Sequence, residues 1–168
     1  MNEKELFFEY DTRKHQQTVA KYMLLIAKKI IDKAIAHDAS KLEEPERSTY
    51  IEPVYSLNHE DVEYGSDRYK ELTNAMGEGW DHHVRVNDHH IEFFIPFSVQ
   101  TLNDPIRSMD LFALIEMLCD WIAASQRRGN NPSLPIKNIR EKYGLDEQLD
   151  AILRNTLQMI ERLPLQET

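Results

Sequence analysis

Residues 13–36 are RKHQQTVAKYMLLIAKKIIDKAIA, and this stretch decides the fold class. Its apolar side chains recur at every third or fourth position, and lysines occupy many of the positions between them. This spacing matches the 3.6-residue turn of an α-helix and predicts an amphipathic helix over Arg13–Ala36. The apolar positions that define the expected inner face are Val19, Met23, Ile26, Ile30 and Ala34.

Further helices are predicted on both sides of a central loop. The sequence Ser40–Glu43 matches the pattern of a capping box, although Pro45 favours a helix that starts slightly later. Turn-forming residues predict a loop from Pro53 to Ser66. From Ser66 to His83 the apolar residues again follow a helical period, which two glycines weaken.

The C-terminal half is also predicted to be helical. Residues 93–100 are aromatic and β-prone with a proline inside, which is typical of a short extended piece. A helix is expected from Asp104 or Ser108 to about Arg127, and a last helix from Asp146 to Leu163. Because no set of alternating strands is present, we expect a single all-α domain over residues 1–168, a bundle of five to seven helices.

Composition narrows the classes of partner. The formal net charge is -9, which disfavours tight binding to duplex nucleic acid because no large basic face is available. The single cysteine, Cys119, cannot form an internal disulfide, and we therefore expect a reducing, cytoplasmic location. No apolar stretch approaches the roughly 20 residues of a membrane span, so we expect neither a membrane anchor nor a leader peptide.

Four of the seven histidines fall within Asp81–His90, which is DHHVRVNDHH. Imidazole and carboxylate groups are the usual ligands of zinc, iron and manganese, so this clustering suggests a metal site, although an exposed polar helix end is the structural alternative. His83 continues the apolar phase of the preceding helix and should point to the core, whereas His82 is rotated by about 100°. His83 is therefore the better candidate ligand.

Three other positions carry metal-ligand chemistry. His37 and Asp38 lie together at the end of the first long helix, where adjacent ligands can chelate one ion. Asp120 interrupts the apolar run of residues 118–123, so its carboxylate must be paired with a cation, an arginine or a helix end. His15 shares the helical face of Val19, where a hydrogen-bonded core histidine is the alternative.

The order of these residues resembles the ligand order of HD-domain proteins, particularly of their binuclear branch. More closely, three motifs resemble a family of small HD-like proteins common in phage and bacterial genomes. The motifs are His-Asp-x-Ser-Lys at 37–41, Trp80 and His83 followed by Asn-x-His-His-x-Glu at 87–92, and Glu-Met-x-x-Asp-Trp at 116–121. The resemblance spans most of the chain.

The resemblance implies a helical bundle that binds one or two divalent ions (Fe, Mn, Zn, Co or Mg) and hydrolyses a small phosphoester, such as a nucleotide, with a metal-activated water. By similarity, His37 and Asp38 are central ligands, Asp38 being able to bridge two ions and so to act in catalysis. By the same similarity, His15 and Asp120 complete the first site, and His83, His89 and His90 bind a second ion. Lys41 binds a substrate phosphate. Asn87 and Glu92 orient ligand imidazoles.

Several alternatives stay open at this level. His59 competes with His83 as a ligand, because in the HD-GYP branch the lone histidine and the His-His pair are farther apart, and the Gly-Tyr-Pro element of that branch is missing after Glu92. Lys41 can instead be a solvated surface lysine with no role in phosphate binding. An HD-fold di-iron oxygenase uses a similar ligand set, and a non-catalytic metal- or nucleotide-binding module is a third class. The apolar face of Leu149–Ile160 can close the core or form a homodimer.

Overall fold

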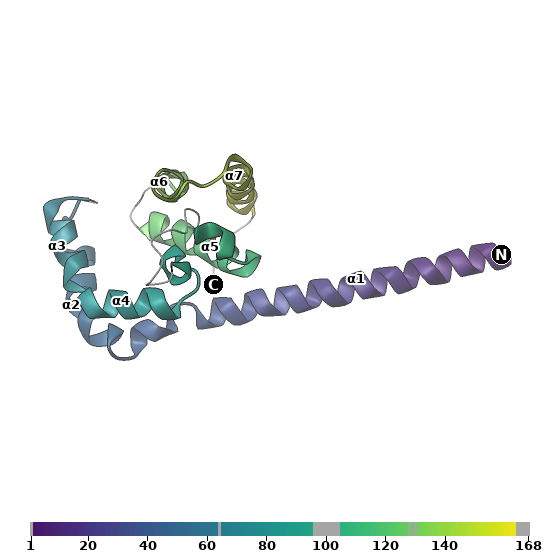
Figure 1. The fold of residues 1–168 in the computed structure, drawn as a ribbon, viewed down its shortest axis with the longest axis horizontal. Helices are drawn as coiled ribbons and strands as arrows, with labels where there is room; N and C mark the ends of the chain where they lie inside the picture. The colour runs from purple at the N-terminus through teal and green to yellow at the C-terminus, as the bar shows by residue number, and fades with distance from the viewer. Residues whose placement is uncertain (1, 64, 96–104, 128, 130, 164–168) are drawn as a thin grey trace. The chain divides into compact units, whose positions relative to one another are not determined.

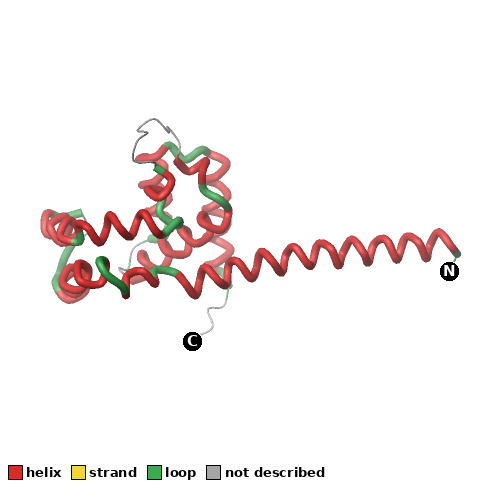
Figure 2. The backbone as a smooth tube through the Cα atoms, turned by 60° about the horizontal axis from the view of Figure 1, so that its bottom comes forward, coloured by secondary structure: helices red, strands yellow, loops and turns green. Residues whose placement is uncertain are grey.

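The computed structural model describes residues 2–63, 65–95, 105–127, 129 and 131–163. These residues form seven α-helices and three short 3-10 helices, with no strand among them (Figures 1 and 2). The prediction of an all-α fold with five to seven helices is therefore confirmed. By its internal contacts the chain divides into two units, Met1–His37 and Asp38–Thr168. The expected single domain stays a prediction.

The first unit is one helix, α1 (Glu3–Ala36). It begins ten residues earlier than the apolar period predicted, because Asn2 and Glu5 form a capping box. The Asn2 side chain accepts a hydrogen bond from the Glu5 backbone at 3.0 Å, and the Glu5 carboxylate accepts one from the Asn2 backbone at 2.7 Å. A single helix cannot cover its own apolar side, and α1 has no buried residue.

The second unit opens with a 3-10 helix, η1 (Ala39–Leu42), followed by α2 (Glu46–His59). The predicted capping box at Ser40–Glu43 does not form, and the later start next to Pro45 is the observed one. The loop predicted from Pro53 to Ser66 begins later than expected, since Pro53 lies inside α2, which extends to His59. Pro53 is buried on the same helix face as Glu46 and Tyr50.

The helical face predicted from Ser66 to His83 is divided between two helices, α3 (Asp67–Ala75) and α4 (Gly77–Val86). Ser66 caps α3 by accepting a hydrogen bond from the Tyr69 backbone at 3.1 Å. The break falls at Gly77, whose positive φ of 39° a residue with a side chain rarely adopts. α2 packs against both α3 and α4 (Figure 1).

The remaining elements are η2 (Ile91–Phe94), η3 (Pro105–Ser108), α5 (Leu111–Arg127), α6 (Ser133–Tyr143) and α7 (Glu147–Glu161). The helix expected from Asp104 or Ser108 begins at Leu111, after η3, and α6 was not predicted at all. The extended piece expected over residues 93–100 is wrong at its start, where Phe93 and Phe94 belong to η2, and residues 96–100 lie outside the described ones. Asp146 caps α7 through the backbone amides of Gln148 and Leu149.

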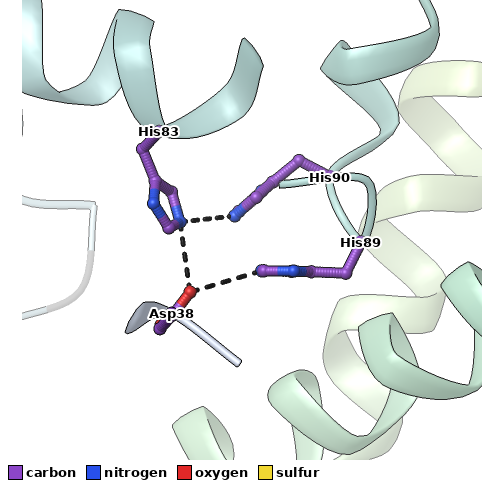
Figure 3. Close-up of side chains that lie close together, drawn as sticks. All are labelled: Asp38, His83, His89 and His90. Carbon is purple, nitrogen blue, oxygen red and sulfur yellow. Dashed lines mark hydrogen bonds and ion pairs between the residues drawn. The ribbon is translucent and has the colours of Figure 1, made fainter. Parts of the chain in front are cut away.

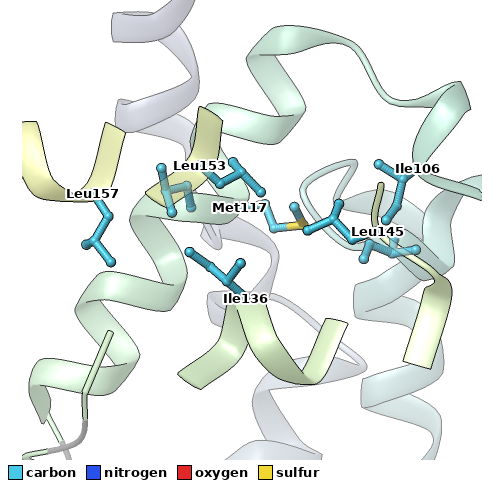
Figure 4. Packing of buried hydrophobic residues seen from close by; sticks show 8 residues of the cluster. Ile106, Met117, Ile136, Leu145, Leu153 and Leu157 are labelled. Carbon is cyan, nitrogen blue, oxygen red and sulfur yellow. The ribbon is translucent and has the colours of Figure 1, made fainter. Parts of the chain in front are cut away.

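The hydrophobic core of the second unit joins α5, α6 and α7 with the two 3-10 helices η2 and η3 (Figure 4). Its buried members are Ile91, Ile106, Met117, Leu118, Ile136, Leu145, Leu153 and Leu157. On the apolar face of Leu149–Ile160, Leu153 and Leu157 are buried, whereas Ile152 is 56% exposed. None of the helices in the described ranges is long and apolar enough to cross a membrane.

Gly79 sets how closely α4 approaches α2. A Cβ atom at this position would lie 1.9 Å from Thr49 Oγ1 and 3.1 Å from a ring carbon of Tyr50. We therefore expect Gly79→Ala to destabilise the fold by about 1–3 kcal/mol, because the helices must move apart or Thr49 must leave its rotamer. Urea unfolding followed by circular dichroism measures the loss.

The double variant Gly79→Ala/Thr49→Ala is the matched control. Removing the Thr49 hydroxyl removes the closest contact, so the double variant should recover part of the stability that the single variant loses. Equal stability of wild type and Gly79→Ala would contradict the close approach of the two helices.

Candidate metal centre

Four candidate ligands meet inside the second unit: Asp38, His83, His89 and His90 (Figure 3). Each offers one ligand atom, and these atoms all lie within 4.8 Å of one another. Asp38 comes directly before η1, His83 lies in α4, and the two other histidines lie in the turn between α4 and η2. The cluster therefore depends on how η1, α4 and this turn pack together.

Asp38 stands at the centre of the cluster. Its Oδ1 atom lies 3.3 Å from His83 Nε2 and 3.5 Å from His89 Nε2. Its Oδ2 atom accepts a hydrogen bond from the ammonium group of Lys41 and forms an ion pair with it. The backbone at Asp38 has a φ of 56°, the left-handed region that few residues other than glycine enter. Such strained conformations concentrate at functional sites, and here the strain accompanies the placement of a candidate ligand.

His83 is fully buried and is held by a buried carboxylate, Glu46. Glu46 Oε2 lies 2.8 Å from His83 Nδ1, and Oε1 lies 2.7 Å from Nδ1 of His82. An ionised carboxylate only accepts hydrogen bonds, so His83 Nδ1 carries the proton and Nε2 keeps its lone pair for the cluster. A carboxylate behind a ligand imidazole is the usual companion of a metal-bound histidine.

Glu46 is ionised in this position. Its side chain has no exposed surface, and burial works to raise the pKa of its carboxyl. Hydrogen bonds from His82, Ser40 and His83 outweigh this effect, so the pKa of Glu46 is lowered overall. Glu46 was not predicted from the sequence, since Glu43, Glu44 and Glu46 follow one another within four positions and only tertiary packing distinguishes them.

His89 repeats the arrangement with a second carboxylate. Its Nδ1 atom lies 3.3 Å from Glu116 Oε1 of α5, and its Nε2 atom faces Asp38. The ring is 2% exposed, so it is shielded from water almost as completely as His83. Glu116 opens the Glu-Met-x-x-Asp-Trp motif, but its pairing with His89 was not predicted from the sequence.

His90 completes the cluster from the same turn. Its Nε2 atom lies 2.9 Å from His83 Nε2, so the two nitrogens point at each other. Burial lowers the pKa of His90 to about 4, and the neighbouring His89 and His83 add to the decrease. The pKa of His83 is lowered as well, by burial and by Lys41. Both rings are therefore neutral at neutral pH, the form that binds a cation.

The other predicted ligands are placed differently. His15 lies in α1 with an exposed side chain, and His37 follows the last residue of α1, so both belong to the first unit and their roles as ligands stay predictions. Asp120 of α5 is half-buried, and one of its carboxylate oxygens lies within 4.8 Å of one of Asp38. His59 is exposed at the end of α2 and stacks on Tyr55, so it is His83 and not His59 that joins the cluster.

The predicted helper residues also have defined contacts. Lys41 neutralises Asp38 through the ion pair with its Oδ2 atom. The amide of Asn87 donates hydrogen bonds to Ser40 Oγ and to the carbonyl of His83, each at 2.9 Å, and so ties α4 to η1. The carboxylate of Glu92 accepts a hydrogen bond from Tyr143 OH at 2.7 Å and links η2 to α6. That Glu92 orients a ligand imidazole stays a prediction.

The chemistry of this donor set fits a divalent transition metal. One carboxylate oxygen and three imidazole nitrogens converge, and two of the imidazoles have a carboxylate behind the opposite ring nitrogen. Mixed nitrogen and oxygen ligands of this kind suit zinc, iron, manganese and cobalt better than magnesium or calcium, which prefer oxygen alone. Asp38, His83, His89 and His90 are the residues that would hold the ion.

Fold and site together define an all-helical protein with a buried histidine and aspartate cluster. A family described as "Family of unknown function (DUF5662)" matches residues 4–159, and the chain belongs to this family. No curated protein and no solved structure matches the chain significantly.

The lowered pKa of His90 makes the stability of the metal-free protein depend on pH. Between pH 4 and 6.5 the unfolded chain binds a proton at this residue that the folded chain does not bind, so stability decreases as the pH falls through this window. We expect the free energy of unfolding to be about 2 kcal/mol lower at pH 5 than at pH 7 from this residue. Urea unfolding in the presence of a chelator measures it.

His90→Gln should reduce this pH dependence, and His59→Gln, which changes an exposed histidine outside the cluster, is the matched control. Identical pH dependence in His90→Gln and wild type would show that His90 titrates normally.

Proposed function

We propose that this protein is a metal-dependent phosphohydrolase of the HD type, acting on a nucleotide or another small phosphoester. The observation that carries the proposal is the position of Asp38 Oδ1 between the Nε2 atoms of His83 and His89, each of which has a carboxylate behind Nδ1. The ligand order that resembles HD-domain proteins supports the same class. A divalent cation held there supplies an acidified water and positive charge for the phosphoryl oxygens.

The protein's own residues prepare this chemistry. Glu46 and Glu116 fix the orientation of His83 and His89, so that the cluster needs little rearrangement to bind its ion. Lys41 is half-exposed and lines a cavity beside His90, so its ammonium group can bind a phosphate oxygen while it neutralises Asp38.

The hydrolysis takes one proton from the attacking water and gives one proton to the leaving group. The oxygen of water bonds to phosphorus, the ester P–O bond breaks, and the leaving alkoxide takes up a proton while the water loses one. The neighbouring carboxylates of Asp38 and Asp120 are the candidate acceptors for the proton that the water loses.

Asp38→Asn tests the centre directly. Asparagine tolerates the left-handed backbone of this position but offers no charge, so we expect the folded variant to lose its bound metal and to lose phosphatase turnover by at least about 100-fold. Elemental analysis of the purified protein counts metal atoms per chain, and a screen of phosphomonoesters measures turnover.

The matched control is Asp81→Asn, which changes an exposed carboxylate on α4. This variant should keep its metal and its turnover. Wild-type protein that binds no zinc, iron, manganese or cobalt even after reconstitution would refute the metal centre, and turnover that survives Asp38→Asn would refute the role of Asp38.

Glu46→Gln tests the carboxylate behind His83. The amide nitrogen of glutamine would face one of the two histidine Nδ1 atoms and force that ring to place its proton on Nε2. We expect metal affinity to fall about 10–100-fold, the usual effect of removing such a partner, and a competition titration with a chelating dye measures it.

Glu43→Gln is the control for this variant, since Glu43 is exposed and lies on the same segment. Circular dichroism establishes that both variants keep their helices. Unchanged affinity in a folded Glu46→Gln protein would contradict the role of Glu46 in orienting His83.

A further inference from the structure

A cavity of about 400 Å³ lies in the second unit, beside the candidate metal centre. Lys41, His90 and Asp120 form part of its lining, so the cavity is continuous with the cluster. Pockets that bind small molecules commonly span about 300–1,000 Å³. The cavity is therefore large enough for a ligand that also reaches the centre.

The rest of the lining is aromatic and apolar. Trp80 of α4 and Trp121 of α5 both contribute, together with Tyr69 and with Leu134 and Ile139 of α6. Trp80 is 41% exposed, and its ring lies edge-on to His90 with the ring centres 5.4 Å apart. Trp121 packs against the hydrophobic core. Aromatic rings with accessible surface next to a phosphate-binding centre favour a flat, apolar ligand group.

Resting on the function proposed above, we propose that this cavity binds a flat aromatic ring carried on the leaving group of a phosphate monoester. The phosphate lies toward Lys41 and the metal centre, and the ring lies against the indoles of Trp80 and Trp121. Stacking on an aromatic side chain stabilises a bound aromatic ring, and an aliphatic alcohol cannot supply this interaction. Asn138 also lines the cavity and offers a donor and an acceptor to ring heteroatoms.

The test uses the fluorescence of the protein itself. The chain contains two tryptophans, and both line this cavity, so their emission reports on binding without any need for turnover. Metal-loaded protein, prepared with zinc to avoid paramagnetic quenching, is titrated with adenosine monophosphate, phenyl phosphate and glycerol phosphate. We expect saturable quenching at concentrations at least tenfold lower for an aromatic phosphate than for glycerol phosphate.

The two aromatic ligands distinguish the source of the ring. Tighter binding of adenosine monophosphate assigns the cavity to a nucleobase, and tighter or equal binding of phenyl phosphate assigns it to a simple aryl group. Either result supports the inference. Equal response to all three phosphates, or no saturable response to either aromatic one, overturns it.

Trp80→Leu keeps an apolar side chain beside His90 and removes the stacking surface. We expect its affinity for the aromatic phosphates to fall about tenfold while its affinity for glycerol phosphate and its metal content stay unchanged. Tyr55→Leu, which removes an exposed aromatic ring of α2 outside this cavity, is the matched control. A Trp80→Leu protein that keeps both its metal and the aromatic preference overturns the assignment.

Hydrolysis of the same three esters separates this inference from the proposed function. An aromatic phosphate that binds but is not hydrolysed with any reconstituting metal overturns the hydrolase and leaves the cavity assignment standing. Hydrolysis of all three esters with equal KM overturns the cavity assignment and leaves the hydrolase standing.

Discussion

The buried carboxylate of Glu46 is the constraint on which the candidate centre depends. A charge with no exposed surface is tolerated only where partners replace its water, and here two imidazoles and the Ser40 hydroxyl do so. These contacts join the first turn of α2 to α4 and to η1, the elements that also place Asp38 and His83. Gly79 permits the approach of α2 and α4 that the contacts require, so the packing of these helices and the chemistry of the centre depend on each other.

Much of the fold follows from helical periodicity, and the departures have local causes. The predicted helices ending at Ala36 and Arg127 end as expected, because long amphipathic segments carry a strong signal. Pro135, inside α6, and the turn-forming residues before it obscured that helix, yet proline is compatible with a helix's first turn. Pro53 likewise led to the prediction of a loop where a helix continues, since its burial in α2 depends on neighbours that are distant in sequence.

The candidate centre was predictable only in part. Clustering and helical phase distinguished His83 from His82, and the structure brings His83 together with Asp38, His89 and His90. Glu46 and Glu116 were not singled out, because nothing in their local sequence separates a carboxylate that is buried behind a histidine from one that is solvated. The ion pairs that reveal them join residues 27 to 37 positions apart, and such contacts are created by tertiary packing alone.

The imidazoles of His83 and His90 are neutral although the chain as a whole carries a formal net charge of -9. Burial lowers the pKa of His83 and His90 and leaves their lone pairs available. A proton and a metal ion compete for these lone pairs, so burial that disfavours the imidazolium reduces the competition that a cation meets. A cation at 100 times its dissociation constant would add about 2.7 kcal/mol to the stability of the folded state. Because its ligands come from the residue before η1, from α4 and from the turn before η2, that stabilisation would act on the packing that forms the centre.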